Sequence, residues 1–502
     1  MQLHAQKGIL ELLPGSDKLG YNEKTGAHRL VGSVNFNYQG NTMYCDSAHY
    51  FDKTNEVRAY GNVHILKDNI NLFCDSLYYN GKTQRAKLWG HVRARDLEYK
   101  LSTDTLEYDA KKGQGIYRHG GKIESITSSE VLTSRVGYFN PDSKDFYFSG
   151  KVKYKNEGLQ MITDTLRYSY GKQTTYFAGA TKIIKDSTFM YCKSGWYNIK
   201  TEEGSLMNEA LIVQQHNKIS GDTLLYRPLI GKSIAKGHVM IEDTVKKTLL
   251  LGNYGELDEK NKSSLLTGNA IARSVRDKDT LHIFADTLFN QNDSIDKHTF
   301  TKAYNNVRFY NTAVQAKCDS LMFNSSNNSA EMFQQPIVWT NKGELKGDSM
   351  TVYLNDSIVD WIHIRNNSTV VMEVDSGNYY NQIGGKEIKA FFRDNEVYQT
   401  NVLGNATTIF YPEETEKTDS STIIKRKGMN RLYAGELRIY LDSSEITGIT
   451  YFDRPDGVFY PLSEIPKKEQ FISNFQWNPT LRPKKSLLEG ILPTRTTNLL
   501  TP

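Results

Sequence analysis

Three stretches of sequence decide the fold, because they are versions of one phrase: residues 45–50 read CDSAHY, residues 74–79 read CDSLYY and residues 103–108 read TDTLEY. The Asp residues of these copies are 29 residues apart, and each Asp follows a small residue and precedes Ser or Thr. Further copies lie at 163–166, 221–224, 285–288, 318–321 and 347–350. Internal repeats with a period of roughly 20–50 residues are typical of repeat architectures, which this chain is predicted to have.

A second phrase, Gly-x-apolar, alternates with the first about fifteen residues further along the chain. It occurs at 61–63, 90–92, 121–123, 150–152, 237–239 and 268–270. Turn residues such as Asn80-Gly81-Lys82 lie between the two phrases. Each repeat is therefore predicted to contain two strands of about eight to ten residues, and the chain to contain about thirteen such two-strand rungs.

Apolar residues alternate with polar ones along these strands, which predicts one buried face per strand. We expect the two strands of a rung to face each other, so that stacked rungs form two opposed sheets. With one strand spacing of about 4.8 Å per rung, the array would be about 60 Å long. The parity assigns these residues to the inward face: Val63, Ile65, Leu72, Cys74, Val92, Leu101, Val152, Tyr154, Met161, Val239, Ile241, Val307 and Phe309.

The apolar positions change parity at the Asp-Ser or Asp-Thr step, as they do at a β-bulge or a sharp bend. We expect the Asp side chains to accept hydrogen bonds from neighbouring backbone N–H groups there. An Asp that recurs in most repeats favours this structural role over bound calcium or a catalytic carboxylate pair. The four cysteines occupy repeat positions rather than zinc-ligand spacings, which predicts buried free thiols; a disulfide between Cys45 and Cys74 stays open as an alternative.

Other functional classes find little support in the sequence. The net charge is +5 over 502 residues, with no basic stripe interleaved with aromatic residues, so nucleic-acid binding is disfavoured. The sequence lacks a run of about eighteen apolar residues, the length of a membrane-spanning helix. It also lacks H-E-x-x-H, a Walker A sequence and a defensible catalytic triad. We therefore predict no catalysis, no metal and no cofactor.

The alternation of Gly-x-Val (61–63, 90–92 and 150–152) with small-Asp-x-apolar-x-Tyr (74–79 and 103–108) resembles the OstA-like family, the periplasmic lipopolysaccharide-transport proteins of the LptA-type bridge. The resemblance covers about residues 8 to 410, and less clearly extends to 452. It implies an all-β, repetitive two-sheet β-jellyroll, a V-shaped, β-taco-like solenoid. It also implies that the inward residues form a groove for lipopolysaccharide acyl chains.

The resemblance further implies the partners and the compartment. The partners are an inner-membrane export complex and an outer-membrane translocon, joined by edge-strand addition, with head-to-tail self-association as a further option. Outer membrane biogenesis in the periplasm is the implied setting. Residues 1–7 are interpreted as the remnant of a trimmed or mis-started signal peptide, 8–452 as the repeat array, and 453–502 as a Pro-containing tail that covers the C-terminal edge or reaches a partner.

Two alternatives of other classes remain. In the first, the chain is a secreted or surface β-solenoid, acting as a scaffold or adhesin, and its interior is a sealed core. In the second, it is a polysaccharide-active β-helix enzyme. Such helices have about three strands per coil, whereas this period accommodates two strands and two turns.

Overall fold

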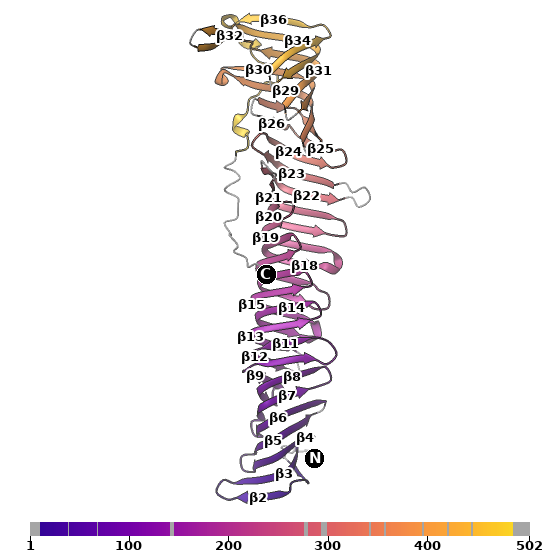
Figure 1. The fold of residues 1–502 in the computed structure, drawn as a ribbon, viewed down its shortest axis with the longest axis vertical. Coiled ribbons are helices and arrows are strands. Elements are labelled where there is room, and N and C mark those ends of the chain that lie inside the picture. The colour runs from indigo at the N-terminus through magenta and orange to yellow at the C-terminus, as the bar shows by residue number, and fades with distance from the viewer. Residues whose placement is uncertain are drawn as a thin grey trace, which may run out of the picture. The chain divides into compact units, whose positions relative to one another are not determined.

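The computed structural model describes residues 11–38, 40–67, 69–140, 145–275, 280–292, 299–340, 343–355, 358–393, 396–418, 421–442 and 445–484. The proposed signal remnant at residues 1–7 and the end of the tail lie outside them. The chain forms two compact units, unit 1 (Met1–Leu229) and unit 2 (Ile230–Thr501). In both, antiparallel strands follow one another along the chain (Figure 1).

Unit 1 contains strands β1 (Glu11–Leu13), β2 (Lys18–Asn22), β3 (Ala27–Tyr38), β4 (Asn41–Phe51), β5 (Glu56–Lys67), β6 (Ile70–Asn80), β7 (Arg85–Arg95), β8 (Tyr99–Asp109), β9 (Gln114–Tyr117), β10 (Gly121–Ser125), β11 (Val131–Ser134), β12 (Val136–Asn140), β13 (Asp145–Asn156), β14 (Leu159–Ser169), β15 (Thr174–Lys185), β16 (Thr188–Asn198), β17 (Gly204–Gln214) and β18 (Asn217–Arg227). Two 3-10 turns follow strands, η1 (Tyr170–Lys172) and η2 (Pro228–Ile230).

Unit 2 contains strands β19 (Lys232–Asp243), β20 (Thr248–Asp258), β21 (Ser263–Val275), β22 (Thr280–Asn292), β23 (Thr299–Tyr310), β24 (Gln315–Asn324), β25 (Ser329–Phe333), β26 (Ile337–Trp339), β27 (Gly343–Lys346), β28 (Ser349–Asn355), β29 (Ile358–Val374), β30 (Tyr379–Arg393), β31 (Glu396–Phe410), β32 (Glu413–Thr418), β33 (Ser421–Arg426), β34 (Gly428–Asp442), β35 (Glu445–Phe452) and β36 (Asp456–Pro461). Its 3-10 turns are η3 (Asp375–Gly377), η4 (Leu462–Glu464), η5 (Lys467–Glu469) and η6 (Pro479–Leu481).

The two strands of a repeat are hydrogen-bonded neighbours. Strand β5, which carries one Gly phrase, pairs with β6, which carries the next Asp phrase, and β6 pairs with β7. The prediction that these strands face each other is therefore wrong, because short turns join them and favour direct hairpin pairing. Each repeat adds two strand spacings, about 9.6 Å, so the predicted length of about 60 Å, which assumed one spacing per rung, is also wrong.

The two sheets arise because the long strands bend near their middle. Between β5 and β6 the register shifts from Tyr60 to Val63, which places Gly61 and Asn62 opposite Asp75 alone. Gly61 and Asn62 both have left-handed backbones, with φ of 73° and 44°, and they turn the strand. One core cluster contains inward side chains from both halves of these bent strands: Ala59, Val63, Cys74, Leu77, Leu88 and Val92. The fold is an all-β two-sheet β-jellyroll whose sheets meet along the line of bulges.

The spacing between the Asp and Gly phrases reflects a direct contact. A Cβ on Gly61 would lie 2.4 Å from Oδ2 of Asp46 in the preceding strand. The Asp carboxylates also contact the residue after each Gly: Asn62 Nδ2 donates to Asp46 Oδ2 at 2.9 Å, and His91 Nδ1 lies 2.8 Å from Asp75 Oδ2. At these two bends the partner is a side chain of the next strand, rather than the predicted backbone N–H group, because the bulge turns the exposed Asp outward.

Replacing Gly61 with alanine is expected to loosen the bend between β4 and β6. The left-handed backbone alone costs an L-residue roughly 1–2 kcal/mol, and the new Cβ would overlap Asp46. Hydrogen–deuterium exchange should report faster opening of β4–β6. Gly20→Ala is the matched control, since a Cβ there contacts nothing within 4 Å; equal exchange in both variants would show that the Gly phrase has no steric role.

All four cysteines are buried and free, as predicted. Burial raises the pKa of Cys45 to about 11 and those of Cys74, Cys192 and Cys318 to about 12. Because the thiolate is the reactive form, these groups behave as small apolar core residues at neutral pH.

The C-terminal residues 462–484 form a strap over the outer face of one sheet of unit 2. Before it, β36 pairs with β34, so the array continues through Pro461. The strap then crosses the strands of unit 2, and it is the yellow segment beside β26 in Figure 1. It covers a row of directly paired, buried positions on successive strands: Gln315, Trp339, Glu344, Val371, Gln382, Ile409 and Arg431.

Side chains of this row bind mainly the backbone of the strap. Gln382 donates to the carbonyl of Gln470 at 2.8 Å and accepts from the N–H of Ile472 at 2.9 Å. Glu344, which is fully buried, accepts from the N–H of Asn478 at 2.9 Å. The tail is predicted from the sequence to cover the C-terminal edge of the array. Residues 462–484 of the tail instead lie on an outer sheet face.

Candidate functional site

An apolar track runs across the strands of unit 1 on the inner face of one sheet. Each member is paired directly with the next: Leu12, Phe36, Met43, Ile65, Leu72, Ala94, Leu101, Ile123, Leu132, Tyr154, Met161, Ile183, Met190, Ile212 and Ile219. Cross-strand neighbours on one face have Cβ atoms about 5 Å apart. The track is therefore a continuous apolar surface from strand to strand.

Next to the track, at the line of bulges, lies a row in which large and small residues alternate across the ladder. Its pairs include Val34 with Cys45, Val63 with Cys74, Val92 with Thr103 and Val152 with Thr163. The four valines of these pairs are completely buried. On β5 and β8, by contrast, the track residues Ile65 and Leu101 are only half-buried. On these two strands the bulge row is buried, whereas the track residues are partly exposed.

Unit 2 repeats this arrangement. Its track contains Ile241, Leu250, Ala272, Ile283, Phe309, Ala316, Val338, Leu345, Val370 and Ile383. Val239 and Val307 are buried beside the bulges. The residues that the sequence assigns to the inward face thus lie on two adjacent rows in each unit. Their contact with lipid stays a prediction.

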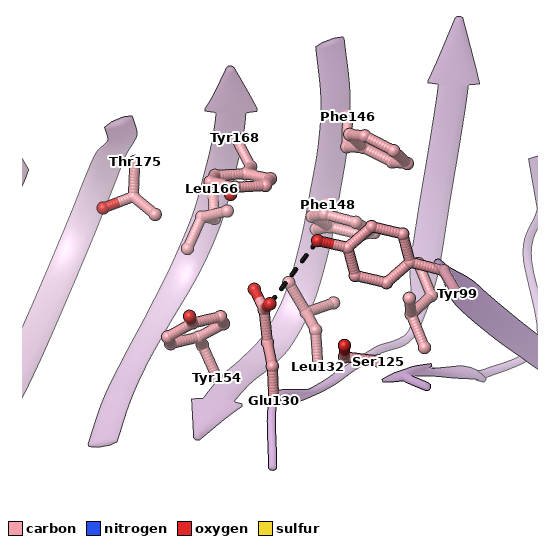
Figure 2. A pocket seen from close by; sticks show the side chains of 11 residues that line it. Tyr99, Ser125, Glu130, Leu132, Phe146, Phe148, Tyr154, Leu166, Tyr168 and Thr175 are labelled. Carbon is pink, nitrogen blue, oxygen red and sulfur yellow. Dashed lines mark hydrogen bonds between the residues drawn. The ribbon is translucent and has the colours of Figure 1, made fainter. Parts of the chain in front are cut away.

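One pocket interrupts the apolar interior of unit 1. It lies between the sheets and is lined by Tyr99, Ile123, Ser125, Glu130, Leu132, Phe146, Phe148, Tyr154, Leu166, Tyr168 and Thr175. Figure 2 shows the Glu130 carboxylate among the rings of Tyr99, Tyr154 and Phe148, with the hydroxyl of Tyr99 donating to it. That hydrogen bond is long, at 3.5 Å. The pocket lies where repeat strands are broken, between β9 and β10 and between β11 and β12.

The pocket disfavours the charged forms of its carboxyl and phenol groups. Burial raises the pKa of Glu130 above its usual value. Burial, and next the nearby Glu130, raise the pKa values of Tyr154 and Tyr168, and the same two causes lead for Tyr99. All three phenols therefore stay neutral at neutral pH. The Tyr154 hydroxyl is buried and makes no hydrogen bond within 3.5 Å, so it interacts with the side chains of Glu130 and Asn156 only beyond that distance.

Glu130→Gln is expected to stabilise unit 1 at neutral pH. Because the folded-state pKa of Glu130 is raised, the folded chain prefers the neutral carboxyl, and this preference is lost as the pH rises through that pKa. Below the unfolded value of about 4.3, both states are protonated and the two proteins should match. Hydrogen exchange of β10–β13 across this range measures the difference, and a gain that is the same at low and neutral pH would contradict the assignment.

The described residues meet the requirements of neither a metal site nor a membrane-spanning helix. Within them, no group of three or more His, Cys, Asp or Glu side chains is arranged to hold a metal ion. None of the described helices is both long enough and apolar enough to cross a bilayer. Sequence reasoning placed Tyr154 on the inner face but missed Glu130, which lies in a degenerate repeat where the Asp phrase is replaced by Ser134-Arg135-Val136.

Family models match both units. Residues 12–164 match the model of the OstA-like protein family. Residues 252–357 match the model of LptA/(LptD N-terminal domain) LPS transport proteins. The first segment is therefore similar to OstA-like proteins and the second to LptA/(LptD N-terminal domain) LPS transport proteins. These segments contain the first part of the unit 1 track, including the pocket strands β9–β13, and the middle of the unit 2 track.

Solved structures add little to these family matches. LptH of Pseudomonas aeruginosa, described as the LptA homologous periplasmic component of the lipopolysaccharide transport device, is 15% identical over 29% of this chain and 80% of its own, with a TM-score of 0.17. The WD40 domain of SCAP from fission yeast is 10% identical over 69% of this chain and 97% of its own, with a TM-score of 0.11. Neither likeness carries an argument at such scores. No curated protein matches the chain.

Proposed function

We propose that this OstA-like chain is a non-enzymatic periplasmic carrier that holds lipopolysaccharide acyl chains along the apolar track and passes them toward the outer membrane. The observation that carries the proposal is the directly paired apolar track in each unit. The family descriptions, which name lipopolysaccharide transport, support the choice of cargo.

The energetics suit a carrier. Burying an acyl chain yields about 0.8 kcal/mol per CH₂, so an apolar surface that spans many strands can hold a chain against water. Apart from Tyr154, the track of unit 1 offers an apolar side chain at each strand spacing, which allows movement without one deep trap. Net transport then requires energy from a partner, since the sequence has no Walker A phosphate loop.

Partners would join at the terminal strands. Strands β1 and β2 both pair with β3, and Leu12, Leu19 and Tyr21 are exposed on them. Strands β35 and β36 both pair with β34, and Val458 and Phe459 are exposed. Unpaired strand edges recruit further strands. The inner-membrane export complex, the outer-membrane translocon or a second copy of the chain are the proposed occupants.

One observation favours the alternative of a scaffold with a sealed core. Along the bulges, Val63, Val92 and Val152 are completely buried and leave no surface for a ligand. The two functions differ at the half-buried track residues, which are accessible to a lipid in a carrier and filled by neighbouring side chains in a scaffold.

A photo-crosslinking amino acid at Ile123, on the track, is expected to capture lipopolysaccharide in cells. The same residue at Ile162, which is exposed on the outer face of β14, is the matched control and should capture none. Capture at neither position, or equal capture at both, would favour the sealed scaffold.

A further inference from the structure

The pocket at Glu130 places polar groups on the otherwise apolar track of unit 1. Tyr154 is a member of the track, paired with Leu132 on one side and Met161 on the other. Among the track positions of unit 1 it is the only residue with a hydroxyl. A cargo chain that follows the track therefore meets one hydrogen-bonding site between long apolar stretches.

The Tyr154 hydroxyl makes no hydrogen bond of ordinary length, since its interactions with Glu130 and Asn156 are longer than 3.5 Å. The residue is 4% exposed, and its oxygen is one of four buried side-chain atoms among the described residues without a hydrogen bond. A buried polar group left unsatisfied costs about 1–3 kcal/mol, and native structures contain few of them. A ligand group that accepts the Tyr154 hydrogen would remove this cost.

Glu130 supplies the complementary group across the same pocket. Its carboxyl lines the cavity together with Tyr154 (Figure 2). Its hydrogen bond to Tyr99 is long, at 3.5 Å, and leaves oxygen lone pairs for a ligand. The hairpin that carries Glu130 is fixed at its base, where the Ser125 N–H donates to the Glu130 carbonyl at 2.9 Å.

The surroundings of these two groups select for a neutral ligand. The walls contain Phe146, Phe148, Leu132 and Leu166, and a phosphate or carboxylate would bring a negative charge beside Glu130 into this apolar space. A hydroxyl group satisfies both sides, because its oxygen accepts from Tyr154 while its hydrogen is donated to Glu130.

We propose that the Glu130–Tyr154 pocket recognises a hydroxyl group carried on an acyl chain. This inference rests on the proposed function, since it assumes that acyl chains occupy the track. It adds selectivity: the chain distinguishes hydroxylated cargo from plain hydrocarbon at one position of the path.

The test uses two lysophosphocholines that differ by one hydroxyl, with tetradecanoyl or 3-hydroxytetradecanoyl chains, competing with a fluorescent acyl probe for the full chain. The hydroxylated lipid should bind about tenfold more tightly, as expected for one additional buried hydrogen bond. Tyr154→Phe should abolish this preference, so that the variant binds the two lipids with equal affinity. The substitution removes only a hydroxyl without a hydrogen bond of ordinary length, so the variant should fold. Tyr147→Phe, on the exposed face of the same strand, is the matched control and should keep the preference.

The outcomes separate the two proposals. If wild type binds both lipids equally, the hydroxyl site is wrong and the carrier stands. If the preference survives in Tyr154→Phe, the site is assigned to the wrong residue, and the inference is overturned. If wild type binds neither lipid, both the hydroxyl site and the carrier proposal are contradicted.

Discussion

Replacing Glu344 with alanine is expected to detach the strap and to destabilise the strands beneath it by about 3–5 kcal/mol, the usual cost of removing one partner of a buried ion pair. The Glu344 carboxylate is fully buried. It lies 2.9 Å from Lys346 Nζ and accepts from Trp339 Nε1 at 2.8 Å and from the N–H of Asn478 at 2.9 Å. The substitution leaves all three donors without this acceptor.

Hydrogen–deuterium exchange measures the effect directly. In Glu344→Ala, residues 469–482 should lose protection, and β26–β31 should open more readily. Glu396→Ala is the control, since Glu396 is exposed at the start of β31. If the strap keeps its protection in Glu344→Ala, the remaining contacts of Gln382 and Arg431 hold it, and Glu344 is not its main anchor.

The strap is relevant to lipid binding because the row of side chains that it covers lies on the opposite face of the sheet from the track. Trp339 and Glu344 alternate with the inward residues Val338 and Leu345 on the same strands. One sheet of unit 2 is thus buried on both faces, by the core and by the strap. Releasing the strap should therefore loosen the sheet that carries the track.

Replacing Leu101 with aspartate is expected to weaken lipid binding by unit 1 more than about tenfold, because a carboxylate on the track must lose water when an acyl chain covers it. Leu101 is half-buried and paired with Ala94 and Ile123 on the track. The chain should still fold, since the Leu101 side chain is already partly exposed, unlike the fully buried valines at the bulges.

Competition binding with the fluorescent acyl probe measures this loss, and circular dichroism verifies the fold. Leu97→Asp adds the same charge four positions earlier, at a residue that is 72% exposed, and should bind lipid as wild type does. Equal losses in the two variants would point to an effect of net charge and not of the track.

Much of the fold could be predicted from the two phrases, because bulges require particular residues. Gly61 and Asp46 are fixed by a left-handed backbone and by a close contact, so they recur visibly in sequence. Strand pairing could not be predicted in the same way, since period-2 alternation defines the inner face of β5 but not which strand lies beside it.

The inward residues could be predicted by the same reasoning, whereas Glu130 and the row that the strap covers could not. Glu130 lies in a repeat that lost its phrase, so its position relative to Tyr154 depends on the folded hairpin. The row that the strap covers could not be recognised in the sequence, because Gln315 and Gln382 look like ordinary outward polar residues. The apolar outward position Ile409, next to inward Thr408, was a local signal that both sheet faces are covered.

The most direct test of the account is to identify the lipid that purifies with the full chain from periplasmic extract, by mass spectrometry of the intact complex and its extract. The account predicts bound lipopolysaccharide in wild type and in Leu97→Asp, and its loss in Leu101→Asp. A wild-type chain that purifies without lipid, or lipid that stays bound equally in Leu101→Asp, would contradict the claim that acyl chains occupy the track.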